Sequence, residues 1–146
     1  MKAAIYIGKP ELEKDLRLAA LIDALRRGGC DLYSVYGAED VAEDTDMLLS
    51  VGGDGTFLSC AAIAGRLGLP LMGVNLGRLG FLSENRPEDV ASAILSGDYV
   101  IEDRTMLRAD VRTGNEPMDA WPYALNEMTV RRSGAAMLGV DVVLDG

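Results

Sequence analysis

The chain has 146 residues, which is enough for one ordinary domain, or for one small domain and part of a second. Hydrophobic residues make up 49% of the sequence and only 5 positions are proline, a composition typical of a packed globule rather than a disordered polymer. With 14 basic and 23 acidic residues, the net charge is −9, so most of the surface would repel nucleic acids and anionic lipids, and we expect neither as a partner.

The absence of histidine restricts the available chemistry. It excludes an imidazole base, a Ser–His triad and histidine metal ligands, so acid–base work falls to carboxylates. Cys30 and Cys60 lack CxxC spacing, which favours reduced, buried thiols over a disulfide framework or a zinc site. No stretch approaches the roughly 20 apolar residues of a membrane span, and the apolar run at residues 3–7 is too short for a secretory leader. We therefore expect a soluble, cytoplasmic protein without a metal site of its own.

The first 97 residues alternate between strand and helix patterns. Strands are predicted at residues 3–7, 32–36, 47–51 and 71–74, and helices at 11–27, at 57–66 and from Pro87 to the residue before Gly97. Pro87 suits a first helical position, and Glu88 and Asp89 suit the positive end of the helix dipole. This alternation predicts an α/β domain over residues 1–97, with a parallel sheet covered by helices and ligands beyond the carboxyl ends of its strands.

The pattern changes after Gly97. Successive strands, with no helix between them, are predicted at residues 99–102, 107–112, 123–132 and 138–144. This pattern indicates an antiparallel β-rich domain over residues 98–146. Asp145-Gly146 is a turn signature that ordinarily introduces another strand. Fewer than about fifty residues are a thin basis for an independent β domain. We expect this second domain to be incomplete in the chain, or to depend on the first domain or on a partner subunit.

Three glycines surround one carboxylate where the strand at 47–51 ends, in the run Gly52-Gly53-Asp54-Gly55-Thr56. Glycine lets backbone N–H groups approach an anion closely, and Asp54 is placed to receive a hydroxyl proton, so the run indicates phosphoryl transfer. It matches neither the P-loop pattern nor the GxGxxG fingerprint. From the spacing alone, a phosphate site and a tight structural turn stay open as alternatives.

Two later segments also carry polar groups beside strands. Residues 75–82 combine glycines with polar side chains directly after a strand, and Asn126-Glu127 interrupts an apolar run. Asn and Glu together can donate and accept hydrogen bonds with a ribose diol or a base edge, although either one alone is more typical of a strand edge. For Phe81, which lies among apolar neighbours, composition alone favours a core position. For Arg78, an exposed loop position is favoured over a phosphate contact.

Taken together, the glycine run, residues 75–82 and Leu125-Asn126-Glu127 resemble the NAD kinase family in order and separation. The glycine run alone is shared with diacylglycerol kinases, sphingosine kinases and 6-phosphofructokinases, and the later segments narrow the resemblance. It implies a two-domain, homo-oligomeric enzyme that binds small-molecule nucleotides. It also implies transfer of a phosphoryl group from ATP with Mg²⁺, or from inorganic polyphosphate, to the adenosine ribose 2′-hydroxyl of NAD, giving NADP.

The resemblance also implies roles for the matching residues. Asp54 would be the proton acceptor, and the backbone of Gly53, Gly55 and Thr56 would face the phosphates. Phe81 would line the adenine pocket. Asn126 and Glu127 would contact the dinucleotide. Family members continue into a glycine- and threonine-rich segment that this chain lacks. Two alternatives stay open: a non-catalytic NAD-binding fragment, and a lipid or sphingoid-base kinase, which would need a membrane-facing basic or amphipathic segment that the sequence does not show.

Overall fold

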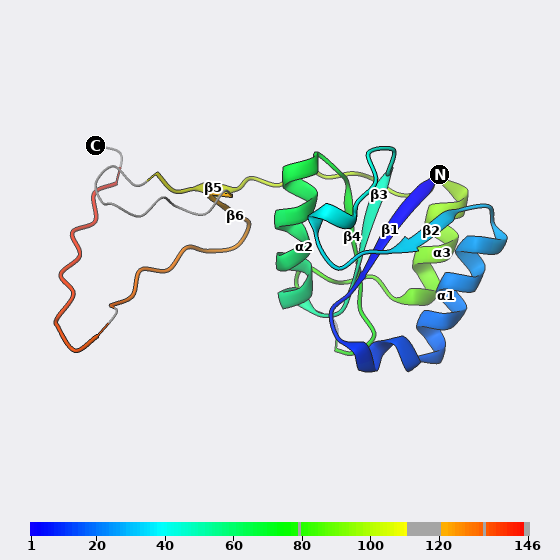
Figure 1. The fold of residues 1–146 in the computed structure, drawn as a ribbon, viewed down its shortest axis with the longest axis horizontal. Coiled ribbons are helices and arrows are strands. Elements are labelled where there is room, and N and C mark those ends of the chain that lie inside the picture. Colours follow the sequence, from blue (N-terminus) through cyan, green and yellow to red (C-terminus); the bar gives the residue numbers. More distant parts are fainter. Residues whose placement is uncertain (79, 111–120, 133, 145–146) are drawn as a thin grey trace.

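The computed structural model describes residues 1–78, 80–110, 121–132 and 134–144. Its central sheet has four parallel strands in the order β2-β1-β3-β4, formed by β1 (Lys2–Ile7), β2 (Asp31–Ser34), β3 (Met47–Val51) and β4 (Leu71–Val74). The register places Ala4 of β1 opposite Tyr33 of β2 and Leu48 of β3. Helices lie on both sides of this sheet (Figure 1), which confirms the predicted α/β architecture.

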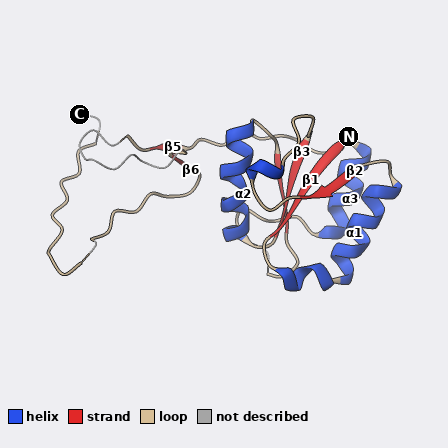
Figure 2. Ribbon diagram, in the orientation of Figure 1, coloured by secondary structure: helices blue, strands red, loops and turns tan. Residues whose placement is uncertain are grey.

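Both faces of the sheet are covered. Helices α1 (Leu16–Arg27) and α3 (Pro87–Ser96) lie together on one face, and α2 (Asp54–Leu67) lies on the other (Figure 2). Because successive strand residues point to opposite faces, Ala3 and Ile5 join the core beneath α1 and α3, whereas Ala4 joins the core beneath α2. The inner strand β3 is buried at every position. This double burial explains why its sequence is an unbroken apolar run rather than an alternating one.

Two helices differ from their predicted bounds. Residues 11–27 form a 3-10 helix, η1 (Pro10–Lys14), followed by α1, because Asp15 between them adopts an extended backbone and its carboxylate accepts the Arg17 N–H at 2.9 Å. This N-cap outweighed the apolar periodicity, as short polar side chains do at helix starts. Helix α2 begins at Asp54 rather than at residue 57, so the glycine run itself forms its first turn. A second short 3-10 helix, η2 (Ala38–Asp40), precedes β3.

Beyond α3, the described residues form one small antiparallel pair, β5 (Leu107–Arg108) with β6 (Tyr123–Ala124). The predicted strands at 99–102 and 138–144 are wrong, and the one at 123–132 holds for its first two residues. A strand must pair its N–H and C=O groups with a neighbour, and these residues belong to neither sheet in the described part of the chain. They run as extended chain away from the sheet (Figure 1). Residues 111–112 of another predicted strand, and the Asp145-Gly146 turn, lie outside the described residues.

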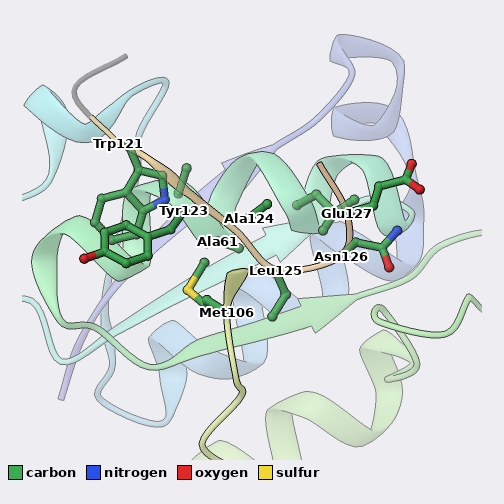
Figure 3. A pocket seen from close by; sticks show the side chains of 10 residues that line it. Ala61, Met106, Trp121, Tyr123, Ala124, Leu125, Asn126 and Glu127 are labelled. Atoms are coloured by element: carbon green, nitrogen blue, oxygen red, sulfur yellow. The ribbon is translucent and has the colours of Figure 1, made fainter. Parts of the chain in front are cut away.

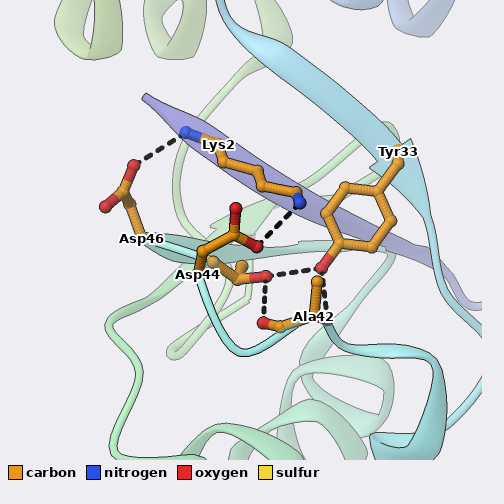
Figure 4. A network of polar contacts seen from close by, with 6 residues as sticks. Lys2, Tyr33, Ala42, Asp44 and Asp46 are labelled. Carbon is orange, nitrogen blue, oxygen red and sulfur yellow. Dashed lines mark hydrogen bonds and ion pairs between the residues drawn. The ribbon is translucent and has the colours of Figure 1, made fainter.

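A polar network joins the start of β1 to the segment that precedes β3, at the amino-terminal edge of the sheet (Figure 4). The backbone N–H of Lys2 donates to Asp46 at 2.7 Å, and its ammonium group pairs with Asp44 at 2.7 Å. The Tyr33 hydroxyl accepts the Ala42 N–H at 2.9 Å. These bonds secure the segment that leads into β3.

Two further predictions concern the chain as a whole. Cys30 and Cys60 are both buried and unpaired, as their spacing predicted. No helix in the described part of the chain has the length and apolar character needed to cross a membrane.

Candidate functional site

Glycine-containing turns follow the neighbouring strands β1 and β3 at the carboxyl edge of the sheet, at Gly8 and at Gly52. The chain leaves β1 toward α1 on one face and leaves β3 toward α2 on the other, and such a divergence opens a crevice that α/β proteins use for ligands. Gly8 donates its N–H to the Val51 carbonyl at 3.0 Å, and Gly52 donates to the Val74 carbonyl at 2.9 Å. A Cβ at Gly8 or Gly52 would overlap the Thr56 side chain, so the glycines let Thr56 enter the crevice.

The carboxylate of Asp54 binds the backbone of a second turn, which follows β4 and whose described residues are 75–78 and 80–83. Its Oδ2 accepts the Phe81 N–H at 3.0 Å, and its Oδ1 accepts the N–H groups of Leu82 and Ser83, each at 3.1 Å. These three donors, with Phe81 the strongest, lower the pKa of Asp54 below its usual value of 3.8. Asp54 is therefore ionised at neutral pH.

The two oxygens of this carboxylate are unequally occupied. A carboxylate oxygen can accept about two hydrogen bonds. Among the described residues, Oδ1 of Asp54 receives two donors and Oδ2 receives one. Oδ2 therefore keeps an acceptor position for a further donor, such as the hydroxyl group of a ligand.

Gly80 makes this arrangement sterically possible. A Cβ at Gly80 would overlap the carboxylate of Asp54, so a larger residue would push the second turn away from α2. Gly80 also closes its own turn by donating its N–H to the Ser83 carbonyl at 3.3 Å. Gly80, one of the glycines in the segment at 75–82, thus lies directly against Asp54.

Ser83 joins the two turns, and sequence reasoning did not single it out. Its side chain is fully buried, and its hydroxyl donates to the Gly52 carbonyl at 2.9 Å. Its carbonyl accepts the Nδ2 of Asn75, which is also buried, at 3.0 Å. Asn75 donates as well to the Arg78 carbonyl at 2.7 Å, so one amide secures both sides of the turn. The sequence signal was weak, because Ser83 is marked only by its place directly after residues 80–82.

Arg17 supports the same turn from α1 and was also missed. Its Nη2 donates to the Leu76 carbonyl at 2.6 Å, across 59 positions of sequence. The same guanidinium group makes two bonds to Asp15, at 3.1 and 2.7 Å. The side chain of Arg17 holds the pKa of Asp15 at about 2. The N-cap of α1 therefore also orients a side chain that braces the second turn.

The first turn of α2 presents the residues predicted to face phosphates. Gly53 is the N-cap and has no side chain to bind the helix end, while its carbonyl accepts the Phe57 N–H at 3.1 Å. The N–H groups of Gly55 and Thr56 belong to the turn that has no partner within the helix. Gly53 and Gly55 are exposed. The helix end thus offers backbone donors that suit an anion.

Phe81 differs from the composition-based interpretation. Its side chain is 92% exposed, so a core position is wrong. The physical reason is its backbone, since the bond from its N–H to Asp54 holds the residue at the rim of the turn. Arg78 is exposed on the same turn.

Asn126 and Glu127 line a pocket of about 240 Å³ beside α2 (Figure 3). The other lining residues are Leu58, Ala61, Ala62, Met106, Trp121, Tyr123, Ala124 and Leu125. Leu58 lies one turn beyond Asp54, a rise of about 6 Å along the helix axis. The pocket is smaller than the roughly 300–1,000 Å³ of most ligand sites, so it has room for part of a dinucleotide rather than the whole. The structure thus brings the pair to the helix that carries Asp54.

Comparisons with known proteins agree on one family. Residues 24–99 match the family model described as the ATP-NAD kinase N-terminal domain. The chain is 31% identical to an NAD kinase of Bacteroides fragilis, over 100% of this chain and 57% of the relative. It is 36% identical to an NAD kinase of Mycobacterium bovis, over 85% of this chain and 41% of the relative. The chain thus spans about half the length of the curated relatives it matches.

One solved structure is also similar. It is a crystal structure of an NAD kinase from Archaeoglobus fulgidus in complex with ATP, and it is 28% identical to the chain described here. The match covers 67% of this chain and 37% of that one, with a TM-score of 0.49.

Proposed function

Because the chain belongs to the NAD kinase family, we propose that the protein transfers the γ-phosphoryl group of ATP to the adenosine ribose 2′-hydroxyl of NAD, giving NADP and ADP. The observation that carries the mechanism is the carboxylate of Asp54. It is ionised and stands in the first turn of α2, whose N-cap Gly53 has no side chain. Its Oδ2 accepts one hydrogen bond from the described residues, which leaves an acceptor position there with respect to them.

In the proposed reaction, the 2′-oxygen forms a bond to the γ-phosphorus while the bond from that phosphorus to the bridging oxygen of ADP breaks. The hydroxyl proton passes to Oδ2 of Asp54. Such transition states are loose, so positioning matters more than a strong base, and a carboxylate with a lowered pKa can accept the proton late. The bonds from residues 81–83 would hold that carboxylate in one orientation.

The remaining predicted roles follow from exposure and position. The N–H groups of Gly53, Gly55 and Thr56 would bind phosphate oxygens, since the positive end of the α2 dipole favours an anion there. The exposed ring of Phe81 would stack on the adenine. The exposed side chains of Asn126 and Glu127 would bind a ribose or a base edge of the dinucleotide.

Magnesium would enter with the nucleotide. Within the described ranges, no group of three or more His, Cys, Asp or Glu side chains could hold a metal ion. We propose an ion held mainly by substrate phosphates and water, as Mg²⁺ often is. Bound in this way, it would neutralise phosphate charge close to Asp54. We propose ATP as the donor, and inorganic polyphosphate as the alternative to compare with it.

Three further properties complete the proposal. Residues 1–97 form the nucleotide-binding domain and residues 98–146 belong to a β-rich domain, because the four-stranded sheet and its helices all lie before Gly97. The protein is a homo-oligomer, which is supported by exposed apolar side chains such as Val140 and Val142. It is located in the cytoplasm, where Cys30 and Cys60 would stay reduced.

The test uses the full-length protein with NAD, ATP and Mg²⁺, and measures NADP. We expect Asp54→Asn to lower kcat by about 10²- to 10⁴-fold, the usual contribution of acid–base groups. Asparagine at position 54 would also turn an NH₂ group toward the N–H groups of residues 81–83 and could displace that turn. Gly80→Ala is therefore the comparison variant, because it displaces the same turn but keeps the carboxylate. A full-rate Asp54→Asn enzyme would contradict the assigned base.

Two other results would favour the alternative functions. If calorimetry detects NAD binding while the unsubstituted protein forms no NADP with either phosphoryl donor, a non-catalytic NAD-binding protein is favoured. If the protein phosphorylates diacylglycerol or a sphingoid base but not NAD, the lipid kinase is favoured.

A further inference from the structure

A glycine inside α2 has a packing partner in the C-terminal part of the chain. Gly65 lies two residues before the end of α2, where glycine weakens a helix relative to alanine. A Cβ at Gly65 would lie 2.5 Å from Cζ2 and 2.8 Å from Cη2 of Trp121. The absence of a side chain therefore lets the indole ring lie directly against the helix backbone.

Two more contacts hold the same indole ring. The guanidinium group of Arg66 lies over the ring of Trp121, 5.9 Å from its centroid, which is a cation–π distance. The ring of Tyr123 lies 4.9 Å from it, tilted by 52°. Both are close enough to orient the indole as well as cover it. Trp121 is thus held from α2 and from its own segment.

Partial burial in the C-terminal part is concentrated at this contact. Of the described residues from 98 to 144, none is buried, and the partly buried ones are Tyr99, Met106, Ala109, Trp121, Pro122, Ala124 and Leu125. Four of these seven line the pocket beside α2. The helix is therefore the surface on which this part of the chain rests, and Trp121 is its largest side chain there.

The contact bears on the proposed site because Trp121 and Asn126-Glu127 lie at opposite ends of one pocket (Figure 3). The other wall of that pocket is α2, which begins at Asp54. A shift of Trp121 on the helix would move the following segment, and with it the distance from Asn126 and Glu127 to Asp54.

We propose that Gly65 and Trp121 form a seat that sets the position of Asn126-Glu127 relative to Asp54. Gly65, Arg66 and Trp121 are then positioning residues, which act on the ligand through the segment at 121–127. The contact itself stands on the geometry of α2 and Trp121, whereas its effect on the dinucleotide rests on the proposed NAD kinase function.

Fluorescence tests the seat without reference to activity. Trp121 is the only tryptophan of the 146 residues, so any tryptophan elsewhere in the full-length protein is first replaced by phenylalanine. We expect Gly65→Ala to shift the emission to longer wavelength and to raise iodide quenching toward the value of the unfolded protein. Helix content should be kept, because alanine favours helix. Ser59→Ala, on the exposed side of α2, is the matched control and should leave the emission unchanged. An unchanged emission in Gly65→Ala would overturn the seat.

Kinetics then test the positioning role. We expect Gly65→Ala and Trp121→Ala to raise KM for NAD by about 10- to 100-fold, the usual effect of a small misplacement, with KM for ATP changed less than twofold. Trp121→Phe should raise KM for NAD less than Trp121→Ala does, because phenylalanine keeps an aromatic ring against the helix. The Nε1 of Trp121 is buried without a hydrogen-bond partner among the described residues, so its N–H is not needed for the contact. A shifted emission with an unchanged KM for NAD would overturn the positioning role.

The two proposals fail in different ways. If the unsubstituted protein neither binds nor phosphorylates NAD, the proposed function and the dinucleotide role of the seat are both overturned, while the fluorescence result still decides the contact between Gly65 and Trp121.

Discussion

Asp54 and Ser83 lie 29 positions apart in sequence, and the side chain of each binds the backbone of the turn that contains the other. Oδ1 of Asp54 accepts the Ser83 N–H at 3.1 Å, and the Ser83 hydroxyl donates to the carbonyl of Gly52, two residues before Asp54, at 2.9 Å. Ser83 is fully buried, whereas Asp54 is partly accessible. The accessible carboxylate is therefore held in part by the backbone of a residue whose side chain is buried.

Ser83→Ala should destabilise the fold and reduce activity together. Without the hydroxyl, the buried Gly52 carbonyl loses a donor, which costs about 1–3 kcal/mol of unfolding free energy. Denaturant melts would measure the loss, and NADP formation its effect on the site. Ser96→Ala is the matched control, because Ser96 also donates to a carbonyl, that of Ser92 at 2.8 Å, but at an exposed position. Equal stability of the two variants would contradict the role of Ser83.

Gly80→Ala should displace the second turn from α2. The new Cβ would overlap the Asp54 carboxylate, so the bonds from residues 81–83 would lengthen or break. We expect a fall in kcat of about 10²-fold, the effect of misplacing a catalytic group by about 1 Å. Gly77→Ala is the control on the same turn, since a Cβ there lies 3.7 Å from its nearest neighbour, Asn75 Oδ1, an ordinary contact. If the two alanine variants are equally active, close approach at Gly80 is not required.

Asp15 should contribute to stability in a pH-dependent way. Its hydrogen bonds with Arg17 lower its pKa from 3.8 to about 2, so the folded state favours the ionised carboxylate. The resulting stability is fully present above the unfolded pKa of about 4, and it is lost as the pH falls toward about 2.

Denaturant melts between pH 6 and 2 check this expectation with Asp15→Asn, which keeps the capping oxygen but cannot ionise. The unsubstituted protein should lose stability more steeply than the variant below about pH 4. Parallel curves would show that the bonds between Asp15 and Arg17 add no pH-dependent stability.

Tyr33→Phe should reduce stability but not activity. Loss of the hydroxyl leaves the Ala42 N–H without its acceptor at 2.9 Å, a cost of about 1–2 kcal/mol. The network lies at the amino-terminal edge of the sheet, away from Asp54, so the KM values and kcat should be unchanged. Tyr36→Phe is the matched control, because Tyr36 is 80% exposed and its loss should be within about 0.5 kcal/mol. A large fall in kcat for Tyr33→Phe would contradict the separation of the two edges.

The regular elements of the α/β domain were predictable because their signals are local. The strands Met47–Val51 and Leu71–Val74 match the prediction to the residue, and α3 starts at Pro87 and ends before Gly97. Local signals failed where two of them competed or where a partner was needed. The N-cap at Asp15 interrupted an apolar period, and the alternating residues after Gly97 mostly found no strand to pair with in the described part of the chain.

The sequence by itself determined the parallel α/β architecture, the place of the glycine run after a buried strand, and the residues that match the family. The tertiary structure alone decided that Asp54 binds the backbone at 81–83, that Arg17 supports Leu76, and that Gly65 contacts Trp121. Backbone N–H and C=O groups are the same in nearly every residue, so no residue type marks them as partners. Contacts across 27 to 59 positions are chosen by how the sheet and its helices pack.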